Sequence, residues 1–130
     1  MKIYLLLLII SINTNIIFAQ KCSVDSLHAK TEFDNLNYTK LFSDSLASSF
    51  FIEIKKDIDE HKHALHSEHI VVIEGSARMT LADSAFHIQK GDIIFIPKNT
   101  FHSVSTVSST PLKVISIQAP YFDGTDRIWK

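Results

Sequence analysis

Four of the seven histidines in this chain lie within nine residues, inside the segment HKHALHSEHIVVIEG at 61–75. They are His61, His63, His66 and His69, with Glu68 among them. Imidazoles and carboxylates together are ligands of divalent transition metals. In a strand, residues two apart point to the same face, so His61 and His63 enter one cavity together or face solvent together.

Two more residues favour the cavity over an exposed histidine run. Glu68 begins the next apolar segment, five residues after His63, where a hairpin would fold its carboxylate back beside the two imidazoles. His102 follows the proline turn at 97–99 and begins another β-type segment. Three histidines and one carboxylate brought together in this way predict a metal site.

The spacing of these residues resembles the two motifs of the cupin superfamily. The first motif, H-x-H-x4-E-x6-G, is matched by His61, His63, Glu68 and Gly75. The second, G-x5-P-x-G-x2-H-x3-N, is similar to Gly91, Pro97 and His102. Fifteen residues separate Gly75 from Gly91, as in the small single-domain cupins of the type-2, RmlC-like kind. The resemblance covers roughly residues 38–119.

Three positions depart from these motifs. Asn99 stands where the second motif has Gly, Thr106 stands where it has Asn, and Lys55 replaces a Gly that often lies six residues before the first histidine. Asn tolerates a left-handed backbone better than most residues, so Asn99 is expected to preserve the turn. Lys55 suggests that the chain enters the strand that bears His61 in a different way from the family members that have Gly at this position. None of the departures falls on a ligand position.

The resemblance implies an all-β, single-domain jelly-roll barrel, the cupin double-stranded β-helix, with one divalent metal ion inside it. Carried over position by position, the metal ligands are His61, His63, Glu68 and His102. This donor set suits Mn, Fe, Ni, Cu or Zn. Four protein ligands leave one or two coordination positions where water or a substrate could bind.

The remaining histidines are assigned weaker roles. His66 lies in the hairpin between the ligands, where it is either a solvated loop residue or an outer hydrogen-bond partner; it is the only candidate catalytic base. His69 alternates with Glu68 and is expected to point away from the metal. His28 and His87 have no partner that the sequence can name.

Short β-type segments separated by turn residues support the all-β prediction independently of the resemblance. The expected strands are 38–42, 50–56, 69–74, 77–81, 85–88, 93–96, 101–107 and 113–119. The predicted organisation is a signal peptide at 1–19, an N-terminal arm or short helix with the first strand at 20–48, the barrel at 49–119 and a tail at 120–130. Within the tail, FDGTDR is expected to form a charged, solvated turn that caps the barrel or meets a neighbour.

The N-terminal segment is expected to direct export to the periplasm or the exterior. Lys2 precedes an apolar run, and Ala19 offers a small residue at a cleavage point. A membrane anchor is the alternative, but polar residues at 11–15 interrupt the run. A lipoprotein at Cys22 is less favoured because Lys21, a large residue, precedes it.

Composition excludes some classes of partner. After cleavage, the chain would keep 111 residues with 12 basic and 14 acidic side chains, which gives no electrostatic reason to bind nucleic acid or an anionic membrane. Cys22 is the only cysteine, so no intramolecular disulfide can form. A homodimer is expected, because cupins commonly pair through edge strands and an open edge needs covering.

Three functions are compatible with such a site. The first is a metal-dependent enzyme acting on a small oxygen-rich molecule, such as a dioxygenase, an isomerase or a lyase. The second is a binding module that holds a sugar or organic acid without turnover, and the third uses the metal mainly for stability. The cupin resemblance alone does not separate them, since one fold hosts many chemistries.

Overall fold

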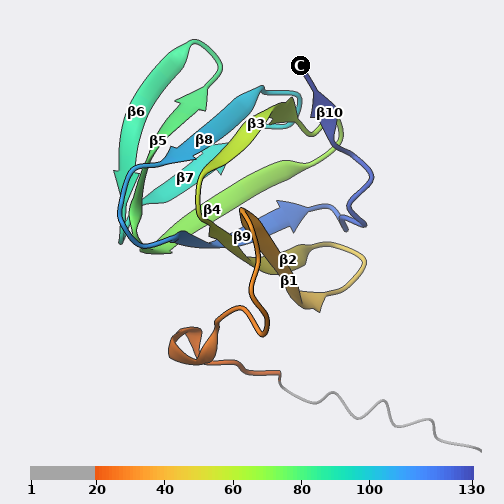
Figure 1. The fold of residues 1–130 in the computed structure, drawn as a ribbon. Helices are drawn as coiled ribbons and strands as arrows, with labels where there is room; N and C mark the ends of the chain where they lie inside the picture. The colour runs from red at the N-terminus through yellow and green to blue at the C-terminus, as the bar shows by residue number, and fades with distance from the viewer. Residues whose placement is uncertain (1–19) are drawn as a thin grey trace, which may run out of the picture.

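The computed structural model describes residues 20–130, so the predicted signal peptide at 1–19 lies outside the described residues. The regular secondary structure of the described chain is almost entirely β-strand, which confirms the predicted fold class (Figure 1). Its elements are η1 (Val24–Ser26), a single 3-10 turn, and the strands β1 (Leu36–Ser43), β2 (Ser48–Ile54), β3 (Asp57–Lys62), β4 (Ser67–Glu74), β5 (Ser76–Leu81), β6 (Ser84–Gln89), β7 (Ile93–Ile96), β8 (His102–Thr106), β9 (Leu112–Ala119) and β10 (Ile128–Trp129). Within residues 20–130, no helix is long and apolar enough to cross a membrane.

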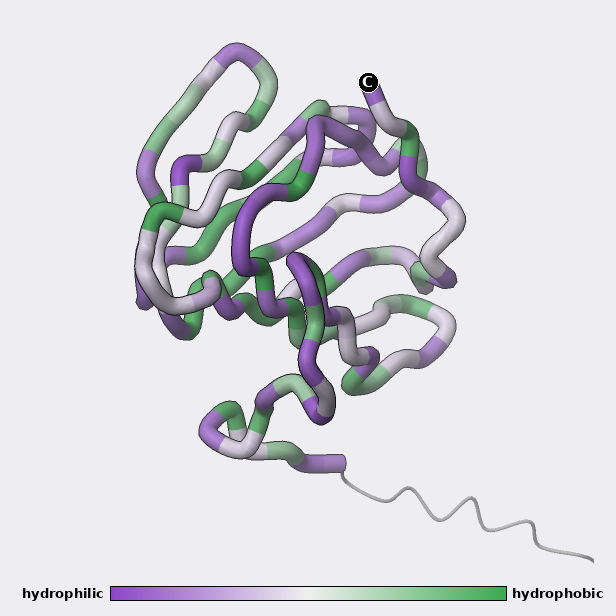
Figure 2. Tube along the Cα trace, in the orientation of Figure 1, coloured by the Kyte–Doolittle hydropathy of each residue, from purple (hydrophilic) through white to green (hydrophobic). Residues whose placement is uncertain are grey.

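The strands form two five-stranded antiparallel sheets that enclose one core. One sheet has the order β1-β2-β9-β4-β7 and the other has the order β10-β3-β8-β5-β6. Figure 2 shows apolar and polar residues alternating along many of the strands, as expected where one face of a sheet is buried. The buried apolar side chains include Phe50, Ile52, Ile54, Val72, Met79, Ile96, Leu112, Val114 and Phe122.

Two turns with unusual backbone angles place the strands that bear the site. Gly75 joins β4 to β5 at φ +78, and a Cβ there would lie 2.7 Å from the carbonyl oxygen of Pro111, so only Gly fits. Asn99 adopts φ +61, as predicted for the residue that replaces Gly in the second motif. Its amide donates a hydrogen bond to the carbonyl of His63 at 2.6 Å, which ties the turn before β8 to the chain after β3.

Three segments differ from the sequence prediction. β3 (Asp57–Lys62) lies between the expected strands 50–56 and 69–74. β2 ends at Ile54 rather than at Lys56, because the chain bends at Lys55 and Lys56. Both of their backbone amides donate to Asn35, one to its carbonyl and one to its side chain. The tail also differs, since its last residues form β10, which pairs with β3 at the register Trp129↔His61.

Candidate metal centre

The structure brings together all four residues that the sequence predicts as metal ligands. His61 lies in β3, His63 just after it, and His102 is the first residue of β8, where it pairs with His61. One ring nitrogen from each of these buried histidines lies within 4.8 Å of the others. Glu68, from β4 of the facing sheet, places Oε2 at 3.5 Å from Nε2 of His63 and 3.6 Å from Nε2 of His102.

Each of the three imidazoles is oriented by a hydrogen bond from its Nδ1 to a backbone carbonyl. His61 donates to Asp59 at 2.8 Å, and His102 donates to Thr100 at 3.0 Å. His63 donates to the carbonyl of Asp126 at 2.5 Å. Because a neutral imidazole has one donor and one acceptor nitrogen, these bonds leave the Nε2 lone pair of every ring available. This arrangement is typical of metal-ligating histidines.

Two of the three histidines are kept neutral by their surroundings. Burial lowers the pKa of His61 to about 4, with smaller contributions from the neighbouring His102 and His63. Burial also lowers the pKa of His102, against the opposing effect of Glu68. A neutral imidazole can bind a metal ion directly, because no proton has to leave first.

His63 and Glu68 shift each other's pKa in opposite directions. Burial would lower the pKa of His63, but the Glu68 carboxylate and the Asp126 carbonyl outweigh it and raise this pKa. Burial would raise the pKa of Glu68, but His63, the Ser116 hydroxyl and His102 together lower it. Glu68 Oε1 accepts hydrogen bonds from Ser116 and, at 3.4 Å, from Gln118, which leaves Oε2 facing the histidines.

The residues present fit a transition-metal ion. Nε2 of His63 is buried without a hydrogen-bond partner in the described chain, and its 3.5 Å separation from Glu68 is too long for a strong hydrogen bond. A metal ion between these atoms would satisfy that nitrogen and the carboxylate at once. Three imidazoles and one carboxylate are a donor set that Mn, Fe, Ni, Cu and Zn accept.

The tail contributes to the site in a way that the sequence analysis missed. Besides the bond from His63 to its carbonyl, Asp126 accepts three hydrogen bonds with its carboxylate: from the amides of Ala64 at 2.9 Å and Leu65 at 2.8 Å, and from His66 Nδ1 at 2.6 Å. The predicted solvated turn is therefore an anchor for the β3–β4 connection. In the sequence of the tail, only Ile128 and Trp129, which are residue types common in strands, indicate strand pairing.

His66, the predicted weak catalytic candidate, lies behind the ligands and is not among the residues that line the cavity. Nδ1 of His66 faces Asp126, and its Nε2 lies 2.9 Å from the carbonyl of Tyr121. Both partners are oxygen acceptors, and each faces one of the two ring nitrogens. His66 therefore links the β3–β4 connection to the C-terminal tail through these two hydrogen bonds. His69 is exposed and packs against Phe95, with the two rings tilted by 40°, and it points away from the centre as expected. His28 and His87 are exposed as well.

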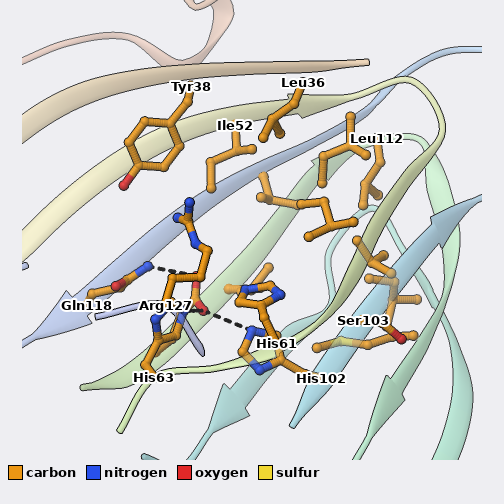
Figure 3. A pocket seen from close by; sticks show the side chains of 18 of the residues that line it. Leu36, Tyr38, Ile52, His61, His63, His102, Ser103, Leu112, Gln118 and Arg127 are labelled. Carbon is orange, nitrogen blue, oxygen red and sulfur yellow. Dashed lines mark hydrogen bonds and ion pairs between the residues drawn. The ribbon is translucent and has the colours of Figure 1, made fainter. Parts of the chain in front are cut away.

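The four ligands lie at one end of a cavity between the two sheets (Figure 3). The cavity is open at its mouth and has a volume of about 70 Å³, which is room for several water molecules or a small ligand group. Trp129 packs beside His61, with ring centroids 5.0 Å apart, and Arg127 extends into the cavity toward Tyr38. Neither Arg127 nor Trp129 was identified from the sequence as a site residue.

Comparisons with known proteins agree with this architecture. A family model described as mannose-6-phosphate isomerase C-terminal matches residues 30–130. An uncharacterized protein of Methanocaldococcus jannaschii is 35% identical over 66 residues, 51% of this chain and 53% of that protein. A mannose-1-phosphate guanylyltransferase of Salmonella typhimurium is 36% identical over 66 residues, 51% of this chain and 14% of that enzyme. The matched segment therefore spans about half of the first relative and a small part of the second.

A solved structure shows the same fold. A protein with a double-stranded β-helix domain from Klebsiella pneumoniae superposes with a TM-score of 0.71 at 18% sequence identity, over 86% of this chain and 99% of that protein. The two facing sheets and the buried histidine cluster between them agree with the sequence motifs. With the family match covering residues 30–130, the chain belongs to the mannose-6-phosphate isomerase C-terminal family, and its fold is the cupin fold.

Proposed function

We propose that the protein binds one divalent transition-metal ion through His61, His63, Glu68 and His102, and that it binds or transforms a small oxygen-bearing molecule beside that ion. The observation that supports this most directly is the arrangement of the three imidazoles. Each has its Nδ1 fixed by a backbone carbonyl and keeps its Nε2 for the centre. Three imidazoles that are each oriented through Nδ1 by a backbone carbonyl are expected at a metal site, and they are not expected in a surface histidine cluster without a function.

The protein residues would position the ion and keep water out. A bound ion would supply a Lewis acid and a template for the oxygens of a ligand. Glu68 supplies negative charge, and Ser116 and Gln118 hold its carboxylate in place. Apolar side chains from both sheets form the remaining wall of the cavity, so charges inside it are poorly screened by solvent.

A non-catalytic binding module is the second candidate function, and one observation favours it. Apart from the four proposed ligands, the cavity-lining residues of the described chain include no carboxylate and no histidine that could serve as a general base. An enzyme built on this site would therefore depend on the metal for its chemistry, as isomerases, lyases or dioxygenases of this kind could. The mannose phosphate chemistry in the relatives' names belongs to those proteins.

Metal analysis of the purified protein tests the proposal. We expect one equivalent of a transition metal per chain, removable by a chelator, and a rise in melting temperature when the metal is restored. At a metal concentration 100-fold above Kd, the free energy of unfolding should rise by about 2.7 kcal/mol. For a domain of this size, that corresponds to a shift of roughly 10 °C. A chelated protein whose melting temperature does not respond to Mn, Fe, Ni, Cu or Zn would contradict the metal site.

We also propose that the protein is exported and forms a homodimer. Export rests on the sequence of residues 1–19. The dimer is supported by exposed apolar side chains on the outer face of one sheet, where Ile93 and Phe95 of the edge strand β7 lie beside His69 of β4, and Ile117 of β9 lies on the other side of β4. A second copy covering this face would remove both the apolar surface and the open edge from water.

Replacing Phe95 by Glu tests the dimer. Phe95 is 51% exposed, so the substitution should cost little in a monomer, but it would place a charge in an apolar interface. Light scattering should give twice the chain mass for the wild type and a single chain mass for the variant. A wild type that is monomeric at micromolar concentration would show that this face has another role.

A further inference from the structure

Most of the side chains that line the cavity are apolar, and this limits which ligands can bind in it. Ten aliphatic side chains line it: Leu36, Ile52, Ile54, Ile58, Ile70, Met79, Ile88, Val104, Leu112 and Val114. Beyond the four metal-site residues, only five lining side chains can form hydrogen bonds with a ligand: Tyr38, Ser103, Gln118, Arg127 and, through its indole N–H, Trp129. A sugar carries a hydroxyl on nearly every carbon, and each one buried without a partner costs about 1–3 kcal/mol. The ligand body that fits these walls is apolar.

Arg127 is the one cationic side chain in this cavity. Figure 3 shows its side chain reaching from the tail toward Tyr38, above the histidine cluster. Among the ion pairs formed by residues 20–130, none includes Arg127. The carboxylate of the adjacent Asp126 is already used by two backbone amides and His66. A positive charge that is half-buried without a counter-ion is expected to bind an anion.

The residues around Arg127 favour the binding of a planar carboxylate to its guanidinium group. Its guanidinium carbon lies 5.9 Å from the ring centres of both Phe122 and Trp129, which restrict its movement while leaving its N–H groups unpaired. Burial raises the pKa of the neighbouring Tyr38, so its phenol stays a neutral donor. The strand pairing of Trp129 with His61 fixes Arg127 close to the metal centre. Nε2 of His63 and Oε1 of Gln118, both of which line the cavity, are buried without partners among residues 20–130, as expected for a cavity that takes a ligand.

We propose that the cavity binds a small organic acid with an aryl or alkyl body, whose carboxylate pairs with Arg127. This inference rests on the proposed function for the place of the ligand beside the metal residues. The proposed function allows any small oxygen-bearing ligand, whereas this inference restricts the ligand class to molecules with a charged group at one end and an apolar remainder. Trp129 is the only tryptophan of the chain and lines the cavity, so its fluorescence reports directly on occupancy.

Calorimetric titration of the purified protein with phenylacetate, hexanoate, neutral phenylacetamide and glucose 6-phosphate tests the proposal, with Trp129 fluorescence as a second readout. The acids should bind more tightly than the amide or the sugar phosphate. Arg127→Met should weaken the binding of the acids by about 10- to 100-fold and leave the amide unchanged. The acids should bind to Arg127→Lys more weakly than to the wild type and more tightly than to Arg127→Met, because lysine keeps the positive charge but lacks the planar guanidinium group. Arg78→Met is the matched control: Arg78 is exposed on β5, between the inward-facing Ala77 and Met79, and its loss should change nothing.

The outcomes separate this proposal from the metal proposal. Each titration is run on chelated and on metal-loaded protein, and the metal content of Arg127→Met should equal that of the wild type. Binding of the acids through Arg127 by a protein that takes no metal would leave the present inference standing and overturn the metal site. Failure of both acids to bind, equal binding by wild type and Arg127→Met, or tighter binding of glucose 6-phosphate would overturn the present inference whether or not metal is bound.

Discussion

Replacing His63 by Ala is expected to remove metal binding at concentrations that saturate the wild type. His63 is 2% exposed, its Nε2 has no hydrogen-bond partner, and it lies nearer to Glu68 than His102 does. Loss of an outer hydrogen-bond partner typically weakens a metal site by about 10- to 100-fold, and loss of a ligand should exceed that. Calorimetry with the metal found in the wild type gives the affinity, and the rise of melting temperature with metal should vanish.

His69→Ala is the matched control for this experiment. It removes an imidazole only six residues further along the chain, but from the outer face, where His69 packs against Phe95. Metal content and metal-induced stabilisation should match the wild type. Should His63→Ala bind metal with wild-type affinity, or should His69→Ala lose it, the proposed ligand set would be wrong.

The fold and the buried cluster of His61, His63 and His102 with Glu68 nearby could be predicted from the sequence because the signals for them are local. Alternating apolar residues mark the strands, and the ligands His61, His63 and Glu68 lie within eight positions on consecutive strands. His102 is further away, but the turn that places it is encoded beside it, in Pro97 and Asn99. The left-handed φ of Asn99 and its bond to the His63 carbonyl show how that turn brings the distant histidine to the others.

The role of the tail could not be predicted, because it depends on contacts between residues far apart in the chain. Asp126 meets His63 and His66 across 63 and 60 residues of sequence, and no spacing rule connects them. FDGTDR looks like a solvated charged turn, and Asp123 does behave in this way, since it bonds only with Thr125. Nothing in the residue types distinguishes Asp123 from Asp126. Only the return of β10 alongside β3 brings one of the two to the site.

Replacing Asp126 by Ala is therefore expected to damage both stability and metal affinity. The substitution removes three hydrogen bonds to one carboxylate and leaves His66, which is 8% exposed, without its charged partner. Breaking a buried pair from one side typically costs about 3–5 kcal/mol. The carbonyl that orients His63 would lose its fixed position, so metal affinity should also fall by about 10- to 100-fold. Asp123→Ala, in the same turn, should leave the free energy of unfolding close to that of the wild type, because the Asp123 side chain is exposed.

The stability lost in Asp126→Ala should depend on pH in a defined direction. Burial would raise the pKa of Asp126, but the hydrogen bonds from His66, Leu65 and Ala64 outweigh it and lower the pKa to about 2. An unfolded aspartate titrates near 3.9, so this contribution is complete above roughly pH 4 and is lost as the pH falls toward 2. Chemical denaturation should show a wide gap between wild type and Asp126→Ala at pH 6 that narrows by pH 2.5. A gap of constant size, or one no larger than that of Asp123→Ala, would mean that the Asp126 carboxylate does not anchor the tail to the metal site.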